Sequence, residues 1–272
     1  MAHKTLISGT AYSVTGGREM IGGTGYAKKK GRVLVNGTGY DIPFSSGIPI
    51  GTLPIGSVVK IGVNDKSYDF LVVNQGIPSN SSLYDSSCDG TWLLMKDIYN
   101  IYRFGQYSSY NTYDVSNIKT YLDGTFLNLV DENVRNAIMQ VKIPYVGKGK
   151  KIHTGSDGLQ VKAFMLSCPE VGFTTSDGSQ FAKDGAKLAY FDEGTGASAN
   201  NKRIAELDGS KRVWWSRSGS VSMMQPGVLT IINTGSSGAS TATNSEGIRP
   251  TFILPDTFPV IQNPGGTYSP AT

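Results

Sequence analysis

The sequence predicts an α+β protein, in which a small all-β repeat module precedes a larger domain of loop-linked strands and two short helices. Three observations predict this fold class: a repeat within the first 44 residues, short runs of β-branched and aromatic residues bounded by Gly, and two segments with helix signals. The composition agrees, because 17% charged residues with 34 Gly and 14 Tyr are typical of a β-rich surface protein.

The repeat has a period of 14 residues, and its copies lie at 6–12, 20–26 and 34–40. Each copy has an apolar pair, a Gly-containing turn and a closing Tyr. Strands this short bury little apolar surface alone, so they need to stack on each other, on further copies or on another protein. Residues 1–44 are therefore either a β-meander packed on the main domain or an attachment and oligomerisation module, and we favour the module.

A stretch rich in Pro, Gly and Ser, residues 45–55, is interpreted as a linker. The main domain is then expected at 56–258. Residues 259–272 are polar and contain three Pro, which predicts an extended tail.

Within the main domain, the runs 57–63 and 68–73 flank a polar turn and predict a β-hairpin. Ser116 is expected to cap a first helix that ends at Gly124. Asp131 is expected to cap a second helix.

The stretch 212–254 is expected to carry the binding surface. Its two ends have the composition of buried strands, whereas the middle, 218–246, is polar and predicts a long exposed loop. Because neighbours in a strand face opposite sides, at most one of Trp214 and Trp215 is expected in the core. Arg217 and Arg249 are expected to bind buried carboxylates or carbonyls.

Residues 107–113 crowd three tyrosines among Ser and Asn, a composition that gives rigid contacts and adaptable hydrogen bonds in antibody paratopes. We therefore expect this segment to lie beside the 218–246 loop and to bind ligand with it. The candidate ligand-binding residues are Tyr107, Tyr110, Tyr113, Trp215, Gln225, Asn233 and Asn244.

Catalytic chemistry has weaker support. His3 and His153 are too few and too far apart in sequence to predict a zinc site or a triad. Cys168 precedes Glu170 and is either a nucleophile beside an acid or, more commonly, a buried cysteine. Adjacent acids at 192 and 193 should point apart. We expect no catalytic residue, no metal and no cofactor.

The net charge of +4 is modest, and the basic runs at 28–32 and 148–151 are interpreted as solvated turns, so no nucleic-acid partner is expected. The start of the chain lacks the apolar region of a signal peptide, and no apolar run is long enough to insert in a membrane. Two cysteines make no disulfide framework, although they could pair. A surface-type composition without an export signal predicts a virus particle released by lysis.

Three segments in a fixed order also carry a resemblance: Ser116 to Phe126, Trp215-Ser216-Arg217-Ser218, and Gly247 to Leu254. Together they resemble an uncharacterised domain family of gut-bacterial and phage proteins. That family is similar to the C-type-lectin-like fold of formylglycine-generating enzymes and phage receptor-binding proteins. The 14-residue repeats resemble N-terminal segments of phage tail-associated proteins. The calcium ligands of lectins are not matched, since this chain offers only Gln225-Pro226-Gly227.

The resemblance implies a C-type-lectin-like domain and a phage setting. We therefore expect a non-catalytic virion protein, a homo-oligomeric adhesin of a tail fibre or baseplate. Residues 1–44 would bind other virion proteins, and the main domain would bind a glycan or protein of the host surface. The alternatives are a purely structural decoration protein of head or tail and, with less support, a carbohydrate-processing enzyme.

Overall fold

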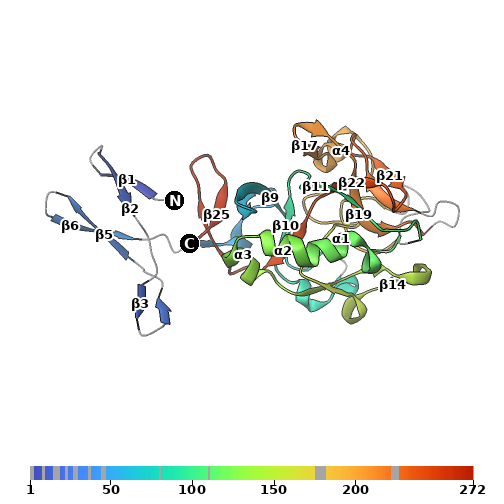
Figure 1. Cartoon of the computed structure of the whole chain (residues 1–272), viewed down its shortest axis with the longest axis horizontal. Helices are drawn as coiled ribbons and strands as arrows, with labels where there is room; N and C mark the ends of the chain where they lie inside the picture. Colours follow the sequence, from blue (N-terminus) through green and yellow to red (C-terminus); the bar gives the residue numbers. More distant parts are fainter. Residues whose placement is uncertain are drawn as a thin grey trace. The chain divides into compact units, whose positions relative to one another are not determined.

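In the computed structural model, the chain forms two compact units, Met1–Gly47 with Ala271, and Ile48–Pro270 (Figure 1). The structure describes the backbone of six strands between His3 and Pro43, and then residues 47–79, 81–109, 111–174, 182–221 and 227–271. Each unit is described by itself below.

The first unit contains three antiparallel hairpins, and among the described residues no strand pairing joins one hairpin to the next. In each hairpin, two residues separate the last paired residues of the two strands. These last pairs recur every 14 residues: Ile7 with Thr10, Ile21 with Thr24, and Val35 with Thr38. Each two-residue connection contains Gly, as tight hairpin turns require. The repeat therefore specifies separate hairpins rather than a continuous meander. The strands are β1 (His3–Ile7), β2 (Thr10–Val14), β3 (Glu19–Ile21), β4 (Thr24–Tyr26), β5 (Lys30–Val35) and β6 (Thr38–Pro43).

The second unit is built on an eight-stranded and a five-stranded sheet. The eight-stranded sheet has the order β16-β23-β10-β9-β8-β25-β24-β7. Its strands are β7 (Ile48–Pro49), β8 (Val58–Val63), β9 (Lys66–Gln75), β10 (Thr91–Met95), β16 (Ala163–Phe164), β23 (Thr251–Leu254), β24 (Pro259–Gln262) and β25 (Tyr268–Pro270).

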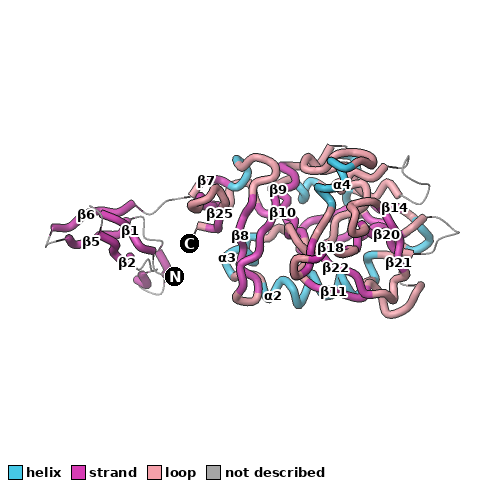
Figure 2. The backbone as a smooth tube through the Cα atoms, turned by 90° about the horizontal axis from the view of Figure 1, so that it is seen from above, coloured by secondary structure: helices cyan, strands magenta, loops and turns pink. Residues whose placement is uncertain are grey.

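The five-stranded sheet has the order β11-β22-β19-β20-β21. Its strands are β11 (Asn100–Arg103), β19 (Trp214–Gly219), β20 (Val228–Ile231), β21 (Ser237–Ser240) and β22 (Ser245–Ile248). Three short pairs complete the strands: β12 (Val141–Ile143) with β15 (Leu159–Val161), β13 (Tyr145–Val146) with β14 (Ile152–His153), and β17 (Glu206–Leu207) with β18 (Ser210–Lys211). Figures 1 and 2 place β8, β9 and β10 toward one end of this unit and β20, β21 and β22 toward the other.

The expected α+β, C-type-lectin-like fold is wrong, because the chain is mostly β: strands make up 35% and helices 20%, and the main feature is a curled eight-stranded sheet. The helices are too short to form a layer of their own. The α- and π-helices are α1 (Asn117–Thr120), a π-helix (Tyr121–Phe126), α2 (Leu127–Leu129), α3 (Glu132–Ala137) and α4 (Ala197–Arg203). Short 3-10 helices lie at Ile50–Thr52, Ser81–Leu83, Ser86–Cys88, Tyr113–Val115, Lys148–Lys150 and Gly155–Asp157.

Strands also occupy the segments expected as linker and tail. Within 45–55, Ile48 pairs with Val260 of the expected tail. The tail folds back once more, so that Tyr268 pairs with Val59 of β8. Both segments therefore belong to the sheet of the second unit.

The predicted β8–β9 hairpin is confirmed. Val63 pairs with Lys66, and the two residues between them, Asn64 and Asp65, have φ of 50° and 60°. Tight hairpin turns of this kind need left-handed backbone, which Asn and Asp tolerate better than most residues. The turn chemistry thus sets the register of the pair.

The first predicted helix is correct at its start and wrong at its end. The Ser116 hydroxyl accepts a hydrogen bond from the Lys119 amide at 3.0 Å, as an N-cap does. Gly124, expected to end the helix, lies inside the π-helix, and helical structure continues to Leu129. In the second helix, Asp131 occupies the N-cap position without a side-chain cap bond.

Both Trp214 and Trp215 are fully buried, so the expectation that one of them would leave the core is wrong. The whole of β19 is buried, which means that both of its faces are covered. Each indole N–H finds a carbonyl: Trp214 donates to Arg203 and Trp215 to Tyr102, both at 2.9 Å.

The expected long loop at 218–246 is also corrected. Strands β20 and β21 lie within it and extend the sheet beside β19. Leu229, Thr230 and Ile231 supply the β-branched and apolar side chains that such strands need, and all three are buried. Among the described residues of this stretch, those at 232–236 and 241–244 form short connections between strands.

Candidate functional site

A buried ion pair joins the middle of β19 to the turn at 167–173. The Arg217 guanidinium binds both carboxylate oxygens of Glu170, at 2.5 and 2.6 Å, and both side chains are completely buried. Arg217 also donates to the carbonyls of Pro144, Met165 and Asp184. Burial alone would lower the pKa of Arg217, but the Glu170 carboxylate reverses this and raises it. The expectation that Arg217 binds a buried carboxylate and carbonyls is confirmed.

A second carboxylate lies in the same interior. The Ser218 hydroxyl is 3.0 and 2.9 Å from the two carboxylate oxygens of Asp184, and it accepts a hydrogen bond from the Cys168 amide. Burial raises the pKa of Asp184 to about 6, against the favourable charge of Arg217. Burial also raises the pKa of the Cys168 thiol to about 12, which keeps the sulfur protonated at neutral pH. Cys168 is thus a buried structural thiol, and Cys88 is free as well, so the two do not pair.

Buried side chains hold two irregular stretches, 165–174 and 182–196, on the sheets. The Tyr84 hydroxyl donates to Glu170 at 2.9 Å and accepts from the Ala186 amide at 2.9 Å. The buried Arg203 guanidinium donates to the carbonyls of Val171 and Asp192, each at 2.6 Å. Interior hydrogen bonds therefore fix these two stretches, as a rigid binding scaffold requires.

Arg249 has a different environment from Arg217. It donates to the carbonyls of Met95 and Lys96 and lies over the Trp214 ring, with 4.6 Å between the guanidinium carbon and the ring centroid. Burial lowers its pKa to about 10. Arg249 thereby fixes the point where the chain leaves β22 for β23, as expected for a residue that binds carbonyls.

The predicted ligand-binding residues fall into three groups. Tyr113 and Trp215 are fully buried, and Tyr113 accepts a hydrogen bond from the Met165 amide at 3.1 Å, so both belong to the framework and present no surface to a ligand. Tyr107, Asn233 and Asn244 are exposed. Tyr110 and Gln225 lie outside the described residues.

The structure brings Tyr107 and Asn244 to the same end of the five-stranded sheet. The Gly105 amide donates to the carbonyl of Ala242 at 2.8 Å, which places loop 105–109 beside turn 241–244. The expectation that the Tyr-containing segment adjoins the late polar stretch is thus confirmed. Asn233 lies in the turn at the other end of β21. We call loop 105–109 together with turn 241–244 the loop surface.

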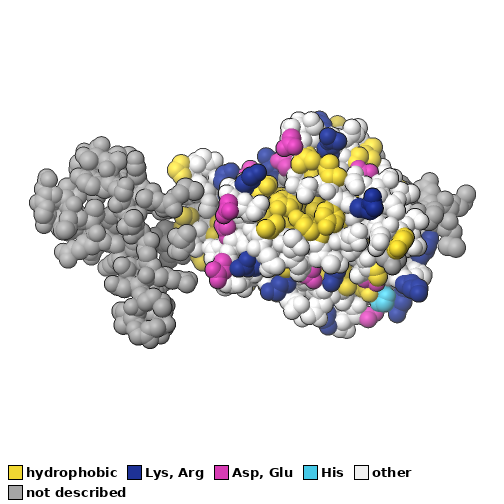
Figure 3. Space-filling view, in the orientation of Figure 1, with side chains coloured by type: hydrophobic (Ala, Val, Ile, Leu, Met, Phe, Trp, Pro, Cys, Tyr) yellow, Lys and Arg dark blue, Asp and Glu magenta, His cyan; other side chains and the backbone are white. Residues whose placement is uncertain are grey.

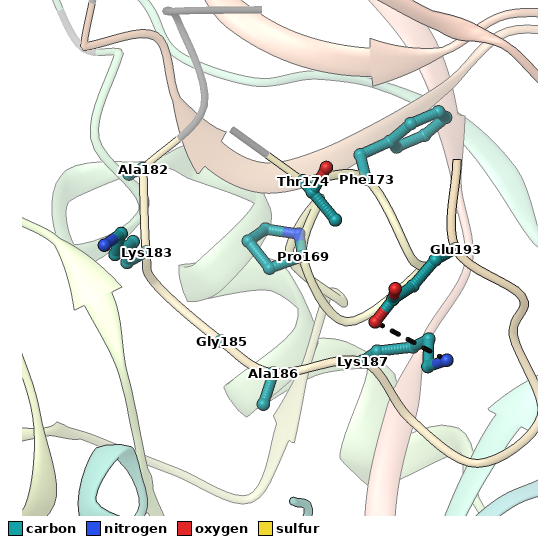
Figure 4. Close-up of a pocket in the computed structure, with 9 residues that line it drawn as sticks. All are labelled: Pro169, Phe173, Thr174, Ala182, Lys183, Gly185, Ala186, Lys187 and Glu193. Carbon is teal, nitrogen blue, oxygen red and sulfur yellow. Dashed lines mark ion pairs between the residues drawn. The ribbon is translucent and has the colours of Figure 1, made fainter. Parts of the chain in front are cut away.

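The acids at 192 and 193 do not form a pair. Asp192 binds Lys202 at 3.0 Å and Glu193 binds Lys187 at 3.5 Å. Glu193 and Lys187 line an open pocket of about 230 Å³ above the 167–173 turn (Figure 4). The other residues that line it are Pro169, Phe173, Thr174, Ala182, Lys183, Gly185 and Ala186.

The part of the chain that the structure describes has neither a metal-binding cluster nor a membrane-spanning helix. There, no three His, Cys, Asp or Glu side chains come together to hold a metal ion. His153 binds Asp157 at 2.6 Å and stacks on Tyr145. Within the same residues, no helix has the length and apolarity needed to cross a membrane.

Sequence reasoning missed a group of four half-buried tyrosines, which we call the tyrosine surface: Tyr68, Tyr99, Tyr102 and Tyr121. The rings come from β9, from the segment before β11, from β11 and from the start of the π-helix. Figure 3 shows hydrophobic side chains gathered on the face where Figure 1 draws β11 and α1. The residues are distant in sequence, and only the spacing of Tyr99 and Tyr102 gave a local signal.

Comparison with known proteins gives one family. Residues 89–256, more than half of the chain, match the model of a domain of unknown function, DUF6273, and the chain belongs to this family. No curated protein and no solved structure matches the chain. The matched region contains Arg217, Glu170 and the loop surface.

Proposed function

We propose that this chain is a non-catalytic recognition protein, an adhesin of a phage particle that binds the surface of the host cell. The observation that carries the proposal is the interior framework of Arg217 and Glu170. It anchors β19 and the turn at 167–173, and β19 pairs with β22, the strand that follows turn 241–244 of the loop surface. Rigid strands that present polar loops are a common way to build a binding site.

The composition of the loop surface supports recognition. Tyr107 has 54% of its surface exposed, which is unusual for a large aromatic side chain. The adjoining turn supplies polar side chains, and the Asn244 amide is oriented by a hydrogen bond to Ser240 at 2.9 Å. Tyr beside Asn and Ser combines a large rigid contact with hydrogen bonding.

The phage setting is part of the proposal. It is supported by the similarity of the repeats to phage tail segments and by a composition that is typical of β-rich surface proteins. The three hairpins of residues 1–44 suit attachment to other virion proteins, because two-stranded sheets gain stability by packing on a partner. Several copies on one particle would add avidity to a weak single contact.

Binding of the labelled full chain to purified cell envelopes of candidate host bacteria tests the proposal. We expect saturable binding that weakens by about tenfold in Tyr107→Ala, with thermal unfolding measured alongside to show that the variant is folded. Lys211→Ala, at an exposed position of β18, is the matched control and should bind as the unaltered chain does. Absence of binding to any envelope would contradict the proposal.

The rival is a structural decoration protein, whose loops contact only other subunits. The side chains of Ile101 and Val115 are 38% and 51% exposed. They give the structural role some support, because exposed apolar side chains suit contacts between subunits. Chemical cross-linking within particles separates the two proposals. Cross-links from loop 105–109 to neighbouring subunits would support the structural role.

A further inference from the structure

The four rings of the tyrosine surface form two contacting pairs. Tyr102 and Tyr121 stack, with ring centroids 4.6 Å apart and 27° between the planes. Tyr68 and Tyr99 meet edge to face at 5.5 Å. Both pairs adjoin the π-helix, because Tyr121 begins it and Tyr99 packs on Phe126 at its end. The result is an aromatic surface of two ring pairs that is partly open to solvent.

This surface is anchored to the core at several points. Tyr99 packs edge to face on the fully buried Phe126, at 5.2 Å. The carbonyl of Tyr102 accepts the indole N–H of Trp215. Rings held in this way lose little conformational freedom when a ligand binds, which favours affinity.

The helix beneath Tyr121 is a second, independent sign of a site. Residues Tyr121–Phe126 form a π-helix within an otherwise α-helical segment. Such insertions are rare and occur frequently at functional sites. Here the π-helix begins at Tyr121 and ends at Phe126, the two residues through which the helix meets the tyrosine surface.

The charge around the surface indicates what it would bind. Burial raises the pKa of Tyr121 to about 12, so its hydroxyl stays protonated. Lys119 near Tyr121 is neutralised by Asp123 at 3.5 Å, and Glu246 lies directly opposite Tyr102 on β22, on the same face of the sheet. A surface of tyrosine hydroxyls beside a carboxylate is complementary to a ligand that carries hydroxyl groups and no negative charge.

We propose that the tyrosine surface is a binding site for a neutral saccharide. The C–H groups on the face of a sugar ring carry partial positive charge and pack on the negative face of an aromatic ring. The sugar hydroxyls would form hydrogen bonds with the tyrosine hydroxyls. A purely apolar ligand would leave the tyrosine hydroxyls without hydrogen bonds. This inference rests on the proposed recognition function and names its ligand class.

The test is an array of neutral oligosaccharides of glucose, galactose and N-acetylhexosamines, with sialylated and phosphorylated counterparts, probed with the full chain. We expect binding to at least one neutral oligosaccharide. Tyr102→Ala and Tyr121→Ala should each weaken it by roughly tenfold. Tyr121→Phe keeps the ring and the fold, and should weaken binding by only a few-fold.

The matched control is Tyr145→Ala, since Tyr145 is also half-buried and stacked, on His153. It should bind as the unaltered chain does. Binding to charged sugars alone, no binding, or equal binding by the Tyr102 and Tyr121 variants would overturn the inference. So would a change from oligomer to monomer in Tyr121→Phe, which would assign the surface to a second copy.

The two proposals fail separately. If Tyr102→Ala and Tyr121→Ala bind cell envelopes as well as the unaltered chain, the saccharide site is wrong and the recognition function stands. If the unaltered chain binds a neutral oligosaccharide but no envelope, the host-adhesin function is wrong.

Discussion

Arg217 on β19 and Glu170 in the 167–173 turn form a bidentate ion pair in which both side chains are completely buried. The two residues are 47 positions apart in the sequence. The pair connects the five-stranded sheet to the turn at 167–173. Since a buried charge without its partner is costly, removing either residue should destabilise this connection.

Arg217→Met should therefore destabilise the chain strongly. It leaves the Glu170 carboxylate buried without its cation, and we expect a loss of about 3–5 kcal/mol in the free energy of unfolding, measured by urea titration. Adding Glu170→Leu should recover part of this loss, because the double variant contains no unpaired charge. A single variant as stable as the unaltered chain would contradict the account of the framework.

Asp184 should make stability depend on pH. Its pKa is raised from 3.8 to about 6, so the folded state holds the proton more tightly than the unfolded state does. The resulting stabilisation is complete below about pH 4 and is lost as the pH rises through 6. Relative to Asp184→Asn, the unaltered chain should lose about 3 kcal/mol between pH 4 and 7, at about 1.4 kcal/mol for each pKa unit. Parallel stability curves for the two proteins would show that Asp184 is not responsible.

The two cysteines should resist alkylation in the folded chain. Burial raises the pKa of both Cys88 and Cys168 to about 12, and neither is exposed. Iodoacetamide at pH 8, followed by mass spectrometry, should therefore modify neither residue until urea unfolds the protein. Rapid modification of Cys168 without urea would instead indicate an accessible nucleophile.

Tyr113 should behave as a core residue. Tyr113→Phe removes the acceptor of the buried Met165 amide and should cost about 1–3 kcal/mol of unfolding free energy, with envelope binding unchanged at temperatures where the variant is folded. Lys211→Ala, at an exposed position of β18, is the control and should leave stability unchanged. Weaker envelope binding by the folded Tyr113→Phe variant would indicate that Tyr113 is a ligand-binding residue.

Local rules predicted the features that depend on near neighbours. Asn64 and Asp65 specified the turn of the β8–β9 hairpin, and Ser116 specified a helix start. The roles of Arg217 and Arg249 also followed from the cost of burying a guanidinium without partners. The 14-residue repeat predicted regular strands, which form separate hairpins.

Features that depend on distant segments were not predictable. Trp215 was assigned to a ligand site because nothing local shows that β19 is covered on both faces. Polar composition suggested a loop at 218–246, where β20 and β21 extend a sheet instead. The tyrosine surface joins residues from Tyr68 to Tyr121, so only the fold brings it together.

Electron cryomicroscopy of purified particles that contain this chain tests the central claim most directly. The account predicts that the loop surface, residues 105–109 and 241–244, faces outward at the host-facing end of the particle, with residues 1–44 bound to neighbouring subunits. A map in which the loop surface is packed between subunits would contradict it.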